Sequence, residues 1–135
     1  MSEGEVPEVG DLLFKYVKGN VGAAIELFEG LKSDVEQAVA SADADIASKV
    51  IIAVRLGEIA EEVEMFKVIA EKDSLSDALF EAISVLLKAL ADLNAGRLDD
   101  VERELNGLQL RLERRLIALL RGAQAGVRGS GEAQR

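Results

Sequence analysis

The chain has 135 residues, the length of a single domain that can bury its own apolar core. It contains no histidine, cysteine or tryptophan, which excludes a disulfide framework, cysteine-based zinc sites and any catalytic triad that needs histidine. The net charge of −9 argues against a generally basic surface of the kind that binds nucleic acid.

The first residues are acidic and polar, unlike the basic start of a signal peptide. No uncharged apolar run approaches the ~20 residues that span a bilayer. The lack of cysteine fits a reducing compartment. We therefore expect a soluble, cytoplasmic protein that does not bind a membrane. Scarce Asn and Gln beside abundant Glu, Arg and Leu give a thermophile-like composition.

The chain begins with a polar lead, residues 1–7, which we expect to be disordered. Residues 8–18 carry a short apolar stripe that predicts a first, short helix. Beyond it, apolar residues recur at steps of three or four, the spacing of one helix face. This spacing predicts four long helices, at about 21–42, 46–72, 75–94 and 99–121.

These elements predict an all-α fold, since nothing in the sequence signals a strand or hairpin. Four long helices joined by short turns favour an up-down antiparallel four-helix bundle, with the short helix as an extra N-terminal element. The predicted bundle domain covers residues 8–122. Four glycines from Gly122 onward lead us to expect a flexible tail at 123–135.

Two helices carry more apolar surface than one core-facing stripe requires. Residues 46–54 are apolar on nearly every side, so we expect neighbouring helices to enclose them. The last helix has two apolar strips at one level, and the second needs cover from the first helix or from another molecule. The predicted interface residues are Leu110, Leu112, Leu116, Ile117, Leu119 and Leu120.

Positive charge is concentrated near the end of the chain. Every lysine lies at or before Lys88, and all arginines except Arg55 lie at or after Arg97. The candidate anion- or partner-binding residues are Arg111, Arg114, Arg115 and Arg121 on the last helix. Their simplest role is to complement the helix dipole, and an alternative is a small regulator that binds nucleic acid.

A run of carboxylates lies on the predicted helix 46–72 and continues around the turn after it. If the protein binds a metal, the candidate ligands are Glu58, Glu61 and Asp77. The stretches 56–62 and 77–80 resemble the Glu-x-x-Glu and Glu-x-x-Asp helices of nucleotide pyrophosphohydrolases of the MazG type. That resemblance implies a metal-dependent hydrolase, although Ser74 stands where the second motif of the family has Glu. A turn near Ser74 would also leave Glu61 and Asp77 roughly 15 Å apart along the helices.

The sequence therefore favours a non-enzymatic interaction protein: a small subunit, adaptor or self-associating partner, with a homodimer as the expected assembly. We predict no catalytic residues, no cofactor and no metal in this main interpretation. The alternatives are the divergent MazG-like hydrolase and the nucleic-acid-associated regulator.

Overall fold

The computed structural model describes the backbone of residues 15–133 and the side chains of residues 15–122. Residues 15–19 form a short helix, and no strand occurs anywhere in the described range. The rest of the short helix predicted at 8–18, residues 8–14, lies outside the described residues. The long helices are α2 (Val21–Ser41), α3 (Ile46–Ile69), α4 (Lys72–Asn94) and α5 (Leu98–Ala133). The all-α prediction is confirmed.

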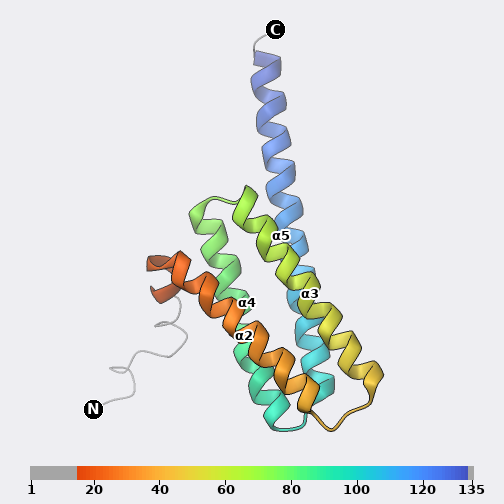
Figure 1. The fold of residues 1–135 in the computed structure, drawn as a ribbon. Helices are drawn as coiled ribbons and strands as arrows, with labels where there is room; N and C mark the ends of the chain where they lie inside the picture. Colours follow the sequence, from red (N-terminus) through yellow and green to blue (C-terminus); the bar gives the residue numbers. More distant parts are fainter. Residues whose placement is uncertain (1–14, 134–135) are drawn as a thin grey trace, which may run out of the picture.

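The long helices form the predicted bundle, and successive helices run in opposite directions (Figure 1). The closest packing joins α2 to α4 and α3 to α5, two pairs of helices that each run in the same direction. Further packing between α4 and α5 joins the two pairs into one body. Figure 1 also shows α5 continuing well past the other helices.

The core is built from the apolar stripes that the spacing predicted. On α4, for example, Leu79, Ile83 and Leu86 are fully buried, three or four residues apart. Burial of such stripes supplies most of the free energy that holds helices together in water. The largest fully buried side chains are Phe66, Ile52, Leu56, Ile59, Leu79, Ile83, Leu86, Leu105, Leu108, Leu112, Val17 and Val35.

The turn between α2 and α3 leads into a helix start that is capped by a side chain. Asp45 is the N-cap of α3, and its Oδ1 accepts a hydrogen bond of 3.1 Å from the backbone N–H of Ser48. This bond satisfies one of the free N–H groups at the start of the helix. Hydrogen bonds from the side chain and from the backbone N–H of Ser48 lower the pKa of the Asp45 carboxyl, because they stabilise the charged form.

The turn between α3 and α4 lies earlier than predicted. Ala70 and Glu71 have extended backbone, so α3 ends at Ile69 and α4 begins at Lys72 instead of near residue 75. Asp73 then falls in the first turn of α4, where the helix dipole favours negative charge.

A buried carboxylate supports the turn between α4 and α5. Asp92 is 4% exposed and accepts hydrogen bonds from Arg97 at 3.1 Å (Nε) and 2.7 Å (Nη2). These bonds hold the pKa of Asp92 below its ordinary value. Gly96 makes the turn with φ +76°, a conformation that side-chain-bearing residues disfavour.

The ends of the chain differ from expectation in one respect. The predicted lead, residues 1–7, lies outside the described residues. The helical backbone of α5 continues to Ala133, whereas the glycines predicted an end near Arg121. Glycine lowers helix stability by about 1 kcal/mol per residue but, unlike proline, leaves every backbone hydrogen bond possible. The flexibility expected of 123–135 stays a prediction.

Within the described residues, no helix combines the length and the apolar character that crossing a bilayer requires.

Candidate functional site

Exposed apolar side chains are concentrated on two neighbouring helices. Of the twelve large apolar side chains exposed in the described part of the chain, seven lie on α3 and three on α5. We call these ten residues the outer face. They are Ile46, Val50, Ile51, Val54, Met65, Val68 and Ile69 of α3 with Leu110, Ile117 and Leu120 of α5.

On α3 the outer face lies opposite the core. Val50 and Val68 are eighteen residues apart, which is five full turns, so they point the same way. The helix is apolar on both sides: its inward side carries residues such as Ile52 and Ile59, both fully buried. The expectation that neighbours enclose residues 46–54 is therefore wrong, because Ile46 is 78% and Val50 53% exposed. α5 covers only one flank of α3 and leaves the side opposite the core open.

The structure divides the predicted interface set into two groups. Leu112 and Leu116 lie in the core, and Leu119 packs partly buried against it. Leu110, Ile117 and Leu120 lie on the other strip and are 42–47% exposed. Only this second strip of α5 can contact another molecule without unfolding the bundle.

A polar seam joins α3 to α5 beneath the outer face. Arg55 donates a hydrogen bond of 2.6 Å to Gln109 Oε1 and lies 3.5 Å from the carboxylate of Glu58. Gln109 in turn donates to Glu58 and, at 3.3 Å, to Glu113. The seam therefore fixes residue 58 of α3 at the level of residue 109 of α5.

Glu62 is the least solvated member of this seam. It is 9% exposed, and its Oε2 atom is enclosed without a hydrogen-bond partner among the described residues. Burial and the negative charge of Glu113 raise the pKa of Glu62 from 4.5 to about 7, against the opposing effect of a hydrogen bond from Gln109. The Glu62 carboxyl therefore keeps its proton to a higher pH than an exposed glutamate does.

The four arginines predicted to bind an anion or a partner fall into two groups. Arg111 and Arg115 both pair with Glu81 of α4, the second at 3.0 Å, so their charge is used to join α4 to α5. Arg114 and Arg121 are exposed and have no ion pair among the described side chains. Of the four predicted arginines, Arg114 and Arg121 are therefore the two without an ionic partner among the described side chains.

The alternative metal ligands are in separate surroundings. Glu58 belongs to the seam, and Asp77 pairs with Lys18 at 3.2 Å. Glu61 is exposed and lines a hollow between α2 and α3. Among the described residues, no group of three or more Asp or Glu side chains is placed to hold a metal ion.

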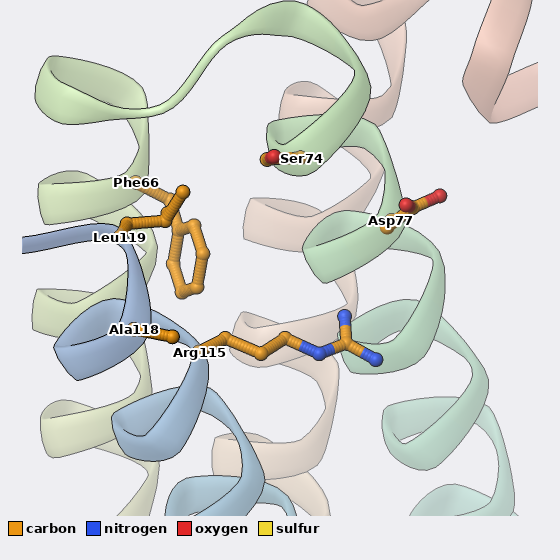
Figure 2. A pocket seen from close by; sticks show the side chains of 6 residues that line it. All are labelled: Phe66, Ser74, Asp77, Arg115, Ala118 and Leu119. Carbon is orange, nitrogen blue, oxygen red and sulfur yellow. The ribbon is translucent and has the colours of Figure 1, made fainter. Parts of the chain in front are cut away.

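A hollow of about 270 Å³ lies where α3, α4 and α5 meet, lined by Phe66, Ser74, Asp77, Arg115, Ala118 and Leu119 (Figure 2). Figure 2 shows the Arg115 side chain reaching from α5 toward α4, while the Asp77 carboxylate points away from Phe66. Each of the two charged groups already has a partner, Glu81 for Arg115 and Lys18 for Asp77. The hollow is near the lower limit of ligand-pocket sizes and offers an incoming ligand no unpaired charge.

Sequence reasoning missed the larger part of the outer face, the seven residues on α3. A signal was present, because an amphipathic helix has one apolar stripe and residues 46–54 have apolar residues all round. We interpreted that signal as burial within the chain.

Comparison of the chain with protein-family models, with curated proteins and with solved structures finds no match.

Proposed function

We propose that this protein is a non-enzymatic helical-bundle interaction protein that self-associates as a dimer through the outer face. The single observation that carries the proposal is the concentration of exposed apolar side chains on α3 and α5. Scattered apolar residues are normal on protein surfaces, whereas a continuous apolar patch marks a contact with another molecule. The lack of cysteine supports a reducing compartment, so we place the protein in the cytoplasm.

The size of the outer face supports a dimer. α3 has 24 residues, or about 36 Å of helix, and two packed helices are about 20 Å wide. The face that α3 and α5 present together, polar side chains included, therefore covers about 700 Å² per copy, which approaches the ~800 Å² per partner of stable protein–protein interfaces. A two-fold dimer uses the same patch on both copies, so the outer face of one copy would be covered by the outer face of the other.

Light scattering on three forms of the full chain tests this proposal. The wild-type protein is expected to have twice the mass of one chain at submillimolar concentration. Ile117→Glu introduces a charge into the outer face and is expected to yield monomers. Leu87→Glu is the matched control, because Leu87 is exposed to nearly the same extent, 43% against 47%, but lies on α4.

A monomeric wild-type protein at every concentration contradicts the proposal. So does an Ile117→Glu variant that remains a dimer, or a Leu87→Glu variant that dissociates equally. Circular dichroism of each variant distinguishes loss of association from loss of folding.

A further inference from the structure

Two neighbouring helices of the outer face carry opposite unpaired charges. Glu61 of α3 is exposed and makes no ion pair among the described side chains, and the same is true of Arg114 of α5. Arg121, also on α5, is exposed and likewise makes no ion pair among the described side chains. The outer face therefore carries an unpaired carboxylate on α3 and an unpaired guanidinium on α5.

The seam fixes the relative height of these charges. Glu58 contacts Gln109, and Glu62 lies against Glu113, so residues 58–62 of α3 are level with residues 109–113 of α5. Because α3 and α5 run in the same direction, Glu61 and Arg114 lie within about one helical turn of the same level.

We infer that the occupant of the outer face is a second copy whose α5 lies over α3 of the first, with Glu61 of each copy paired to Arg114 of the other. This inference rests on the proposed function and adds the orientation of the two copies. A two-fold axis that runs along the helices, between α3 and α5, produces this arrangement and preserves the level of every residue. It also places the apolar residues near the end of α3, Met65 and Val68, against Ile117 and Leu120 of the other copy's α5, which lie at the same level.

The competing orientation places the two-fold axis across the helices, so that α3 lies over α3 and α5 over α5. An axis at the level of these residues brings Glu61 near Glu61 of the other copy and Arg114 near Arg114 of the other copy. Like-charge contacts oppose association, whereas the inferred orientation pairs each carboxylate with an arginine.

Charge reversal distinguishes the two orientations by sedimentation analysis of the full chain. Glu61→Arg and Arg114→Glu, each alone, are expected to weaken dimerisation by about tenfold or more, since each creates two like-charge contacts per dimer. The double variant is expected to dimerise nearly as well as the wild type. A mixture of the two single variants is also expected to recover, because the heterodimer contains only opposite-charge pairs.

The control is Glu26→Arg, which reverses an exposed carboxylate on α2, outside the outer face, and is expected to change the dimerisation constant less than about threefold. Single variants that dimerise as the wild type does, or a double variant as weak as the single ones, overturn the inferred orientation. These outcomes leave the proposed function standing. A wild-type chain that never dimerises overturns both.

Discussion

Replacing Glu62 by glutamine tests the seam between α3 and α5. Glutamine has the shape of a protonated glutamate but carries no charge, so it keeps the packing and removes the unfavourable buried carboxylate. The folded protein holds a proton on Glu62 more tightly than the unfolded chain, because the pKa of Glu62 rises from 4.5 to about 7 on folding. Stability of the wild type therefore falls as the pH rises from about 4.5 to about 7, and stays lower above that range.

The size of the effect follows from that pKa. A rise from 4.5 to about 7 corresponds to about 3 kcal/mol. Water reaches the seam at Glu58, whose side chain is 41% exposed, and screening there reduces the value. We expect Glu62→Gln to raise the free energy of unfolding by about 1–2 kcal/mol at pH 8 and to leave it nearly unchanged at pH 4.5.

Urea unfolding followed by circular dichroism, at one protein concentration and several pH values, measures this difference. The matched control is Glu29→Gln, which removes an exposed carboxylate from α2 and is expected to change stability by less than about 0.5 kcal/mol at every pH. A Glu62→Gln variant that is less stable than the wild type at pH 8 refutes the reasoning. A difference that does not vary with pH refutes it as well.

Three further predictions concern the bundle itself. Leu108→Ala leaves a cavity at a fully buried site and is expected to lower the free energy of unfolding in urea by about 2–5 kcal/mol. Leu87→Ala on the surface is expected to change it by less than about 0.5 kcal/mol. Equal effects of the two variants contradict the assigned core. Gly96→Ala forces a side chain into the φ +76° conformation and is expected to destabilise the fold by about 1 kcal/mol, so a neutral result contradicts that turn. Asp92→Asn removes the carboxylate that Arg97 binds and is expected to lower the Tm at pH 7. Because the pKa of Asp92 is lowered, the wild type loses this advantage as the pH falls through the acid range, and a difference in Tm that persists at low pH argues against the ion pair.

The spacing of apolar residues predicted the bundle and much of its core. Leu79, Ile83 and Leu86 are buried as their spacing indicated, because a helix that hides one stripe must turn it inward. The same spacing does not specify which neighbour each stripe meets. The pairing of α2 with α4 and of α3 with α5 depends on how all the helices share one core, which is a property of the assembled body.

The candidate site was predicted in part. The surplus of apolar residues on the last helix identified Leu110, Ile117 and Leu120, but the stripe alone could not divide them from Leu112 and Leu116. Nothing in the sequence distinguishes Glu62, which is buried, from the other glutamates of the same run. One helical position separates it from the exposed Glu61, and only the placement of α5 decides which of the two is buried.

Accessibility of individual methyl groups tests the central claim most directly, because it reports whether the outer face is covered. We would measure the relaxation that a soluble paramagnetic probe causes in the methyl resonances of Val54, Ile117 and Leu87 while the protein is concentrated. We expect Val54 and Ile117 to become protected as concentration rises, while Leu87 stays accessible throughout. Equal and unchanging accessibility of all three methyl groups would contradict it.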